Sequence, residues 1–487
     1  MECTLGRSGE TAIVIDNIYI LYMRKFLFFL LLLIVAGLTA VVIHDHHPIA
    51  DDTSAQVLCL ELGEDDSRQA LQSLIDSCSA AGGGVVVVPE GVHQMDGPLE
   101  LKSHVRLHLR DSATLFFTSD PDAYLPVVLT RWEGTELYGR SSMIHAQGQT
   151  EIIITGEGTA TIDANGGEMA RWGMPGGRAD FVENVHGTHE ETPETPDVNR
   201  LRQMGEDLTP VADRVFGHGT LLRPCAIELN QCSQVRIEGI TLKNSPFWCI
   251  HPLYCQDVVV RGVTIDSNFP NNDGCDPESC TNVLIEDCTF RTGDDAVAIK
   301  SGRDADGRRV NRPSENITIR NCRFFSKCNG LCIGSEMSGG VRNVRMSNIE
   351  IGDVKNALLF KSNLDRGGYI ETVTLDSIRI GHVSGAVLRF ETNYFGYRGG
   401  HFPARYQHFN IRNVHAQSAD SYAIYYDGNE DEPIRDILVE NFSVDAARHP
   451  HYLFHTNDCR FINCEVNGRL LPETLPQDTA RQQCDVW

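Results

Sequence analysis

The chain has 487 residues, of which 41% are hydrophobic and 22% are charged, a balance typical of globular proteins that excludes a largely disordered chain. Its formal net charge of −24 at pH 7 argues against a nucleic-acid partner, because a polyphosphate is bound by a basic surface. An anionic substrate would need only a local group of basic residues at its site.

An apolar segment near the N-terminus follows a short basic stretch. Met23-Arg24-Lys25 precede the run FLFFLLLLIVAGLTAVVI, residues 26–43. This pattern predicts a signal peptide over residues 23–50, and the run also reaches the lower length limit of a membrane anchor. Residues 1–22 are interpreted as an upstream extension. Both readings place the rest of the chain outside the cytoplasm, in the periplasm or the extracellular space, tethered to the membrane if the segment is retained.

A helix and several short strands are predicted next. Residues 67–83, SRQALQSLIDSCSAAGG, have helical spacing and predict a helix that caps the open end of a β-structure. Residues 82–117 and 150–166 read as short strands with Gly and Asp at the corners. Between residues 166 and 220 the periodicity lapses, and this charged, Pro-containing segment predicts a long loop over one face.

From about residue 230 the chain repeats a short phrase. Copies such as QVRIEGITLKNS from Gln234 and DVVVRGVTIDSN from Asp257 recur down to a copy that begins at Asp436. The apolar residues keep the same phase in every copy. Three residues into each copy stand Ile237, Val260, Ile285, Ile319, Met346, Leu375, Ile411 and Val439.

Such columns form when each repeat is one coil of a solenoid and like side chains stack, with neighbouring coils about 4.8 Å apart. The β-branched residues and the Asn and Gly corners favour strands. The sequence therefore predicts an all-β fold, a right-handed parallel β-helix over residues 55–470, with a C-terminal tail over residues 471–487.

The 16 cysteines have no metal-ligand spacing, so no zinc site is expected, and neither a metal nor a cofactor is predicted. Most of them, including Cys288 and Cys322, fall at core positions of the repeat. One or two local disulfides are compatible with the sequence.

Carboxylates fall at similar phase in successive coils. Asp273 lies in NNDGCDPESC, and Asp294 and Asp295 lie one coil later in RTGDDAVAIKSG. Asn329 and Lys361 follow in the next two coils, at separations of roughly 5–10 Å along the stack.

Three carboxylates at this spacing suit the hydrolysis of a glycosidic bond. One carboxyl group, kept protonated by its charged neighbours, donates a proton to the leaving oxygen, and the others activate a water on the opposite face of the sugar. An inverting mechanism needs acid and base roughly 6.5–9.5 Å apart, which adjacent coils can span. The alternative is that these Asp and Asn residues only cap turns at coil corners.

From about Leu58 to Leu470 the chain resembles glycoside hydrolase family 28, the polygalacturonase family. NNDGCD is similar to the family's Asn-Thr-Asp segment, TGDDAVAIKSG to its Asp-Asp segment, NGLCIGSEMSGG to its Gly-His-Gly segment and LLFKSNLDRGG to its Arg-Ile-Lys segment. The phrases RWEGTE, LLRP and LKNSPFWCIHP resemble the bacterial, often exo-acting members. The resemblance implies a pectin-lyase-like solenoid.

It also implies roles for four residues. Asp294 is expected to be the general acid, Asp273 and Asp295 are expected to activate the water, and Lys361 is expected to bind the sugar in the subsite before the cleaved bond.

Two positions depart from the family pattern. Asn329 stands where the family has His, and Leu359 stands where it has Arg. Asn can form hydrogen bonds but carries no charge, and Leu cannot pair with an anionic sugar. These changes predict either an altered substrate, such as a rhamnogalacturonan or another less acidic glycan, or reduced activity.

Further candidates for substrate binding are His251, Tyr394 and Arg366, together with Asn329. Trp248 is either a stacking platform for a sugar or a core residue. Lys300, Arg303 and Arg366 can supply the positive charge that a polyuronate needs.

The predicted function is that of an exported, monomeric glycoside hydrolase that cleaves α-galacturonosidic bonds in pectin-type polysaccharide. A polysaccharide lyase is a second hypothesis, disfavoured because the Asp-Asp pair fits the hydrolase pattern. A third is a catalytically weak glycan-binding β-helix, which the loss of the family His and Arg supports.

Overall fold

The computed structural model describes residues 58–62, 68–177 and 191–481, all of which belong to one compact unit, Leu58–Trp487. The predicted upstream extension and the signal or anchor segment lie outside the described residues. Within the described ranges, no helix combines the length and the apolar character that a membrane crossing requires.

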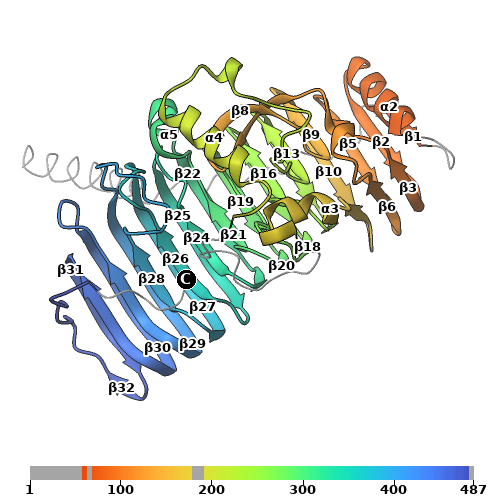
Figure 1. The fold of residues 1–487 in the computed structure, drawn as a ribbon. Helices are drawn as coiled ribbons and strands as arrows, with labels where there is room; N and C mark the ends of the chain where they lie inside the picture. The colour runs from red at the N-terminus through yellow and green to blue at the C-terminus, as the bar shows by residue number, and fades with distance from the viewer. Residues whose placement is uncertain (1–57, 63–67, 178–190, 482–487) are drawn as a thin grey trace, which may run out of the picture. The chain divides into compact units, whose positions relative to one another are not determined.

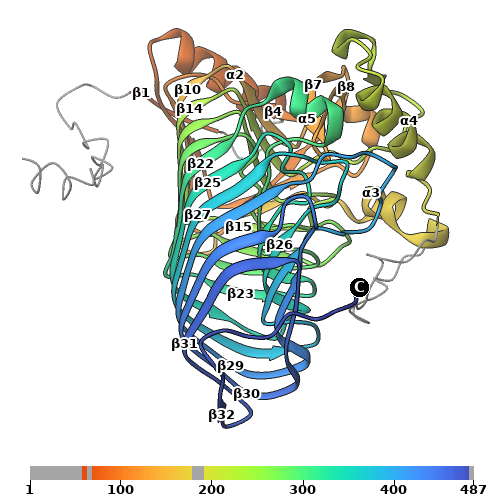
Figure 2. The same ribbon diagram turned by 90° about the vertical axis from the view of Figure 1, so that its left-hand side faces the viewer.

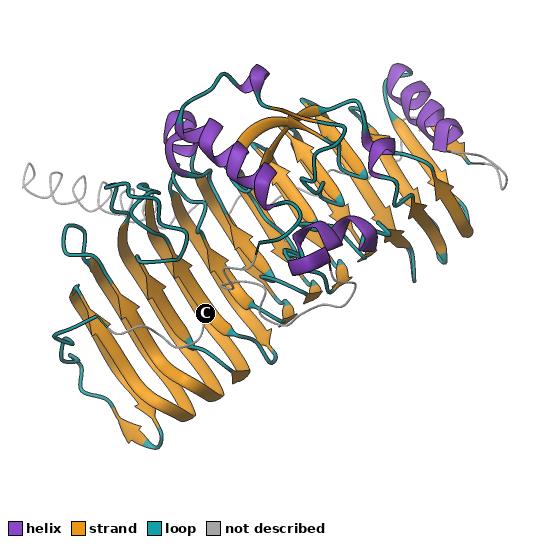
Figure 3. Ribbon diagram, viewed as in Figure 1, coloured by secondary structure: helices purple, strands orange, loops and turns teal. Residues whose placement is uncertain are grey.

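Three faces of parallel strands wind into a solenoid (Figures 1 and 3). The first face contains β1 (Leu58–Glu61), β2 (Gly84–Val88), β5 (Val105–Leu109), β10 (Thr150–Gly156), β14 (Ser233–Glu238), β17 (Gln256–Arg261), β19 (Thr281–Glu286), β22 (Ser314–Arg320) and the first parts of the long strands β25 (Val341–Ile351), β27 (Tyr369–Val383), β29 (Arg405–Asp427), β30 (Ile434–Phe454) and β31 (Thr456–Val466). These long strands continue into the other faces: β25 also pairs with β23, and the end of β29 pairs with β28.

The second face contains β3 (Gly91–Met95), β6 (Ala113–Phe117), β11 (Thr161–Asp163), β15 (Thr241–Lys243), β18 (Thr264–Ser267), β20 (Thr289–Thr292) and β23 (Arg323–Ser326). The third face contains β4 (Leu99–Glu100), β9 (Ile144–Gln147), β13 (Ile227–Asn230), β16 (Ile250–Leu253), β21 (Val297–Ile299), β24 (Asn329–Ile333), β26 (Asn356–Lys361) and β28 (Leu388–Glu391). Between β16 and β21, the bridges at Cys275 and Glu278 continue the third face.

The predicted apolar column exists residue by residue. Ile237 pairs with Val260, Val260 with Ile285, and the pairing continues coil by coil to Ile411 and Val439. Every member of the column is at most 1% exposed, so the repeat phase read from the sequence is the phase of the core. The parallel β-helix prediction is confirmed.

The polar residue that opens each repeat turns the chain into the first face. At these positions, from Gln234 to Asp436, φ lies between 53° and 61°, a left-handed conformation that Asn and Asp adopt more readily than most other residues. Their side chains also bond along the stack: Asn316 donates to Asn282, and Asn343 donates to Asn316, both over 3.1 Å. Asn and Asp are therefore frequent at these corners because the backbone there has a left-handed conformation.

Both ends of the solenoid are covered. The predicted helix is present as α2 (Arg68–Ala80), which packs on the first coils and buries Leu71, Ile75 and Cys78. At the other end β32 (Arg469–Leu470) turns back antiparallel to β31. The described part of the tail then runs back along the last coils, and Arg481 pairs with Asp427 of β29 over 2.9 Å.

The prediction of a long loop between residues 166 and 220 was wrong in one respect, because much of this segment is helical. It contains α3 (Gly167–Ala170), α4 (Thr195–Glu206) and the short 3-10 helices η2 (Arg171–Gly173), η3 (Pro175–Gly177) and η4 (Val211–Asp213). A small sheet of β7 (Val128–Trp132), β8 (Thr135–Gly139) and β12 (Val215–Phe216) lies beside α4. Elsewhere lie η1 (Pro121–Tyr124) and α5 (Asp304–Val310).

These added elements gather on one side of the solenoid. In Figure 2 the strands of the first face lie at the left, and α3, α4 and α5 lie on the opposite side. Val198 and Leu201 of α4 pack into a second apolar cluster with Trp132, Phe216 and Trp248. The helix is therefore fixed over the third face by its own apolar side.

The cysteines from Cys225 to Cys464 are buried thiols that form no disulfide with one another. Several continue the apolar columns, as expected: Cys288 and Cys322 are each 1% exposed.

Candidate active site

The aspartates stand at the start of successive third-face strands. The backbone N–H of Gly274 donates to the Asp295 carbonyl over 2.9 Å, and that of Ala296 donates to the Asn329 carbonyl over 2.8 Å. Asp273, Asp295 and Asn329 are therefore neighbours in three stacked coils, and Asp294 precedes Asp295 in the middle coil.

A cleft of about 240 Å³ opens at this point. Its wall from the solenoid includes all three aspartates together with Lys300 and Lys361. Its opposite wall comes from the turn between β7 and β8 and from α4. The predicted carboxylates thus face one cleft that has walls on two sides.

The Asp295 carboxylate is held from two sides. Asn329 donates its Nδ2–H to Oδ1, and the Lys361 ammonium lies 3.3 Å from Oδ2. Although burial favours the neutral amine, the Asp295 charge raises the pKa of Lys361 well above its usual value. This pair therefore keeps a cation at the floor of the cleft.

A chain of amides fixes the orientation of Asn329. The backbone N–H of Ala386 donates to Asn356 Oδ1 over 3.0 Å, so Asn356 Nδ2 must face Asn329, to whose Oδ1 it donates over 2.8 Å. The Asn329 amide nitrogen is then left to face Asp295. Where the family has His, this chain thus has a donor with one fixed direction.

Asp294 is anchored through its backbone. Its carbonyl accepts hydrogen bonds from Thr292 Oγ1 and Ser326 Oγ, both over 2.6 Å, and its Oδ1 accepts from the Asp295 N–H over 2.8 Å. These bonds fix a side chain that is only 5% exposed beside the cleft.

Asp273 shares a buried cation with two other acids. Lys300 Nζ lies 3.4 Å from Asp273, 3.8 Å from Asp276 and 3.3 Å from Glu336. Burial, followed by the charges of Asp276 and Asp294, raises the pKa of Asp273 well above its usual value, and Lys300 opposes this shift. Crowding was expected to keep a proton on the acid, whereas this raised pKa belongs to Asp273, one of the two residues expected to activate the water. Lys300 is a counterion of the site.

Lys300→Met tests this coupling. Lys300 favours the charged form of Asp273, so its loss raises the pKa of Asp273 further. If Asp273 must be ionised to activate water, the acid limb of kcat/KM moves to higher pH by about 1–3 units, the usual effect of one close charge. Lys102→Met, which removes a lysine that pairs with Glu100 on the surface, serves as the control. An acid limb that stays in place in Lys300→Met contradicts the assignment.

Leu359, which stands where the family motif has Arg, makes the third face apolar at this position. Leu359 pairs in register with Cys332 and Arg389 and packs with Ala298 and Cys332 in a small buried cluster. Arg389, one coil further, is 2% exposed and pairs with Glu391 over 3.0 Å. This part of the third face therefore offers no charged group to a sugar at the Leu359 position.

Tyr394 and Trp248 line the cleft as well. The Lys361 ammonium lies 4.9 Å from the centre of the Tyr394 ring. Trp248 is 2% exposed and also packs in the apolar cluster with α4, so it serves the core and the cleft wall together.

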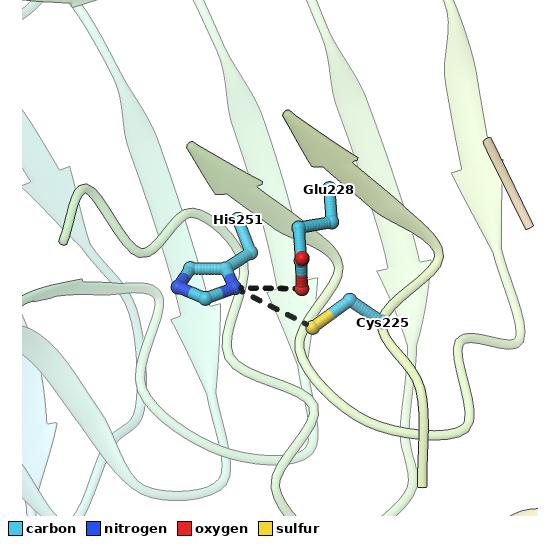
Figure 4. Close-up of side chains that lie close together, drawn as sticks. All are labelled: Cys225, Glu228 and His251. Atoms are coloured by element: carbon cyan, nitrogen blue, oxygen red, sulfur yellow. Dashed lines mark hydrogen bonds and ion pairs between the residues drawn. The ribbon is translucent and has the colours of Figure 1, made fainter. Parts of the chain in front are cut away.

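His251 has a different place. It does not line the cleft formed by the described residues; it lies fully buried against Trp248. Figure 4 shows its ring beside Glu228 and Cys225, with Nδ1 3.3 Å from Glu228. Its Nε2 lies 3.0 Å from Glu278. Burial opposes the charged ring, yet the bonds with Cys225 and the two glutamates raise its pKa well above the usual value.

Arg366 and Asn329 are also absent from the described lining. Arg366 is 1% exposed, donates to the Ser335 carbonyl over 2.9 Å and pairs with Asp304. Both residues act on the cleft through neighbours, Asn329 by its bond to Asp295 and Arg366 by holding the segment that carries Ser335.

Two described groups offer three possible metal-ligand atoms within 4.8 Å of one another: Cys225, Glu228 and His251, and Asp294, Asp295 and Cys328. In the group of Cys225, Glu228 and His251, a metal would have to displace a ring proton of His251, because an imidazole that ligates a metal is neutral. That proton is the one that His251 shares with its acidic partners. The second is the cleft itself.

Sequence reasoning missed the residues of the opposite wall, among them Glu133, Glu194 and Arg202. A helix signal was present for α4: Pro196 and Asp197 lie in the first turn, and Val198, Leu201 and Gly205 are spaced for one buried face. Nothing local indicated that this helix would lie over the cleft.

Comparison with known proteins identifies the family and the fold. The model of glycosyl hydrolases family 28 matches residues 218–465. The crystal structure of a hyperthermoactive exopolygalacturonase from Thermotoga maritima is 39% identical, with a TM-score of 0.74 over 81% of this chain and 87% of that one. A probable polygalacturonase from Vitis vinifera is 28% identical over 79% of this chain and 72% of its own length.

The family 28 exopolygalacturonase of Yersinia enterocolitica shares the fold, with a TM-score of 0.67 and 20% identity over 87% of this chain and 77% of that one. The family model spans the coils that carry all three aspartates and Lys361. The chain belongs to glycosyl hydrolases family 28 and is a glycoside hydrolase.

Proposed function

We propose that the protein hydrolyses α-galacturonosidic bonds of pectin-type polysaccharide with inversion at the anomeric carbon. The observation that carries the proposal is the convergence of Asp273, Asp294, Asp295 and Lys361 on one cleft of a family 28 chain. The names of the relatives, polygalacturonase and exopolygalacturonase, favour a galacturonan over a neutral glycan.

In the proposed mechanism Asp294 donates its proton to the glycosidic oxygen as the bond to the anomeric carbon breaks. Asp273 and Asp295 hold a water on the opposite face of the sugar and take its proton as its oxygen attacks. A base whose pKa is raised toward the working pH, as that of Asp273 is, accepts this proton more readily. Lys361 contacts the sugar next to the cleaved bond.

We further propose that the enzyme attacks chain ends. The wall built by α4 and the β7–β8 turn stands opposite the aspartates and confines the cleft. A wall on the side facing the aspartates leaves less room for the middle of a polysaccharide than for its end. The exopolygalacturonase named above, 39% identical, supports the same mode of action.

Export is proposed from the apolar run at residues 26–43, and the enzyme is proposed to act as a monomer, either released or tethered through that run. Fractionation of cells that express the chain, followed by size-exclusion chromatography of the active fraction, tests both points.

A substrate panel tests the function. We expect reducing ends to be released from homogalacturonan, with monogalacturonate as the first product, and little release from rhamnogalacturonan or neutral glycans. A faster reaction on rhamnogalacturonan would favour the altered-substrate alternative that Leu359 suggests. An unsaturated product that absorbs ultraviolet light would indicate a lyase, and failure to act on every glycan would contradict the proposal.

A further inference from the structure

A line of alternating charges runs across the cleft from α4 to the aspartates. Arg202 lies 2.6 Å from Glu133, and the same Glu133 oxygen lies 3.0 Å from Arg303. Arg303 lies 3.2 Å from Glu336, whose other oxygen lies 3.3 Å from Lys300. Lys300 in turn contacts Asp273, and all six residues line the cleft.

At the α4 end of the line, Arg202 has only a shared counterion. Arg202 and Arg303 share a single carboxylate oxygen of Glu133, but Arg303 also pairs with Glu336 and Asp304, whereas Glu133 is the ion-pair partner found for Arg202 among the described residues. The buried Arg202 Nε has no hydrogen-bond partner among the described residues. Burial and the nearby positive charge of Arg303 lower the pKa of Arg202, which an added anion would reverse.

The third face contributes lysines to the cleft but no guanidinium at the position of Leu359. Leu359 lies in an apolar cluster at the position where the family motif has Arg. Arg202 comes instead from a helix outside the solenoid, and 29% of its side chain is exposed at the cleft. A guanidinium offers a planar pair of N–H donors that matches a carboxylate.

We propose that Arg202, supported by Arg303, forms an anion subsite that binds the carboxylate of a uronic acid at the end of the substrate. The subsite supplies from α4 the recognition that Leu359 cannot supply from the third face. This inference rests on the proposed function, because it assigns one chemical group of that same substrate. Glu133 acts as the built-in counterion that the substrate carboxylate joins or displaces.

The test measures binding in the Asp294→Asn background, so that no hydrolysis interferes. Isothermal titration with a galacturonate trimer and with its carboxyl-reduced counterpart gives two values of Kd. Arg202→Gln is expected to weaken binding of the acidic trimer by about 10- to 100-fold, the usual effect of one lost charged hydrogen-bonding partner, and to leave the reduced trimer unchanged. Arg202→Lys keeps part of the affinity.

Arg200→Gln is the matched control. Arg200 belongs to the same helix, pairs with Asp197 and is half exposed outside the cleft, so its loss should change neither Kd. A merely structural role of Arg202 would weaken both trimers alike, and this result would overturn the proposal, as would an unchanged affinity for the acidic trimer.

Glu133→Gln gives a change of opposite sign. Removing this carboxylate frees the Arg202 guanidinium for the substrate, while Arg303 keeps its pairs with Glu336 and Asp304, so the acidic trimer should bind more tightly. Weaker binding of that trimer alone would overturn the role of Glu133.

The outcomes also separate the two proposals. Suppose that the acidic trimer binds in a way that depends on Arg202 but the unmutated enzyme does not hydrolyse galacturonan. This result overturns the proposed function and keeps the subsite. Turnover of galacturonan with no effect of Arg202→Gln on either trimer keeps the function and overturns the subsite.

Discussion

Asp294→Asn is expected to lower kcat on galacturonan by between about 10² and 10⁴, the range that general acid catalysis usually contributes. The amide keeps the shape of the side chain and can still accept the hydrogen bond from the Asp295 N–H, but it cannot give a proton to the leaving oxygen. Steady-state kinetics give kcat, and titration with a galacturonate oligomer should show nearly unchanged affinity.

The control is Asp266→Asn, which alters an exposed aspartate on β18 outside the cleft. It should leave kcat within twofold. If Asp294→Asn retained most of its activity, Asp294 would not be the acid. If both variants lost activity together with their circular dichroism spectrum, the loss would be one of folding.

Phe390→Ala is expected to have the largest effect on stability. Phe390 is fully buried, and its ring centre lies 4.5 Å from Phe360, 4.7 Å from Phe409 and 4.6 Å from Tyr426. Removing a ring stacked between coils leaves a cavity that its neighbours cannot close. We expect the free energy of unfolding, measured in urea, to fall by about 3–5 kcal/mol.

Phe402→Ala provides the comparison, because Phe402 is 45% exposed. Its loss should change the free energy of unfolding by less than about 1 kcal/mol. Equal losses in the two variants would show that the stacked aromatic residues do not hold the coils together.

The repeat made the fold predictable. A column of apolar residues at constant phase has few structural solutions, and the register from Ile237 to Val439 follows from the phase alone. The polar corner residues were equally informative, since a positive φ restricts which residues can stand there. The caps and the small sheet of β7, β8 and β12 could not be predicted from the repeat, because each of these elements occurs only once in the chain.

The solenoid half of the site was predictable for the same reason. Stacking converts sequence phase into proximity, so Asp273, Asp295 and Asn329 had to be neighbours. Phase does not give the direction of a long side chain. His251 and Arg366 were expected on substrate, yet they lie buried in ion pairs, because neighbouring acids from other coils compete for them.

The residues that α4 contributes to the site could not be predicted from the local sequence. Arg202 meets Glu133 across 69 residues, and the contact depends on how Val198 and Leu201 pack against Trp132 and Trp248. An amphipathic helix can be recognised from its spacing, but the surface that receives it is set by tertiary packing.

The stereochemistry of the first product tests directly whether the carboxylates gathered by the stacked coils cleave a glycosidic bond through an attacking water. Proton NMR during the first minutes of hydrolysis of an α-linked galacturonan distinguishes the two anomers before they equilibrate. We predict the β-anomer, the product of inversion. An initial α-anomer, or an unsaturated sugar, would contradict the assignment of Asp273, Asp294 and Asp295.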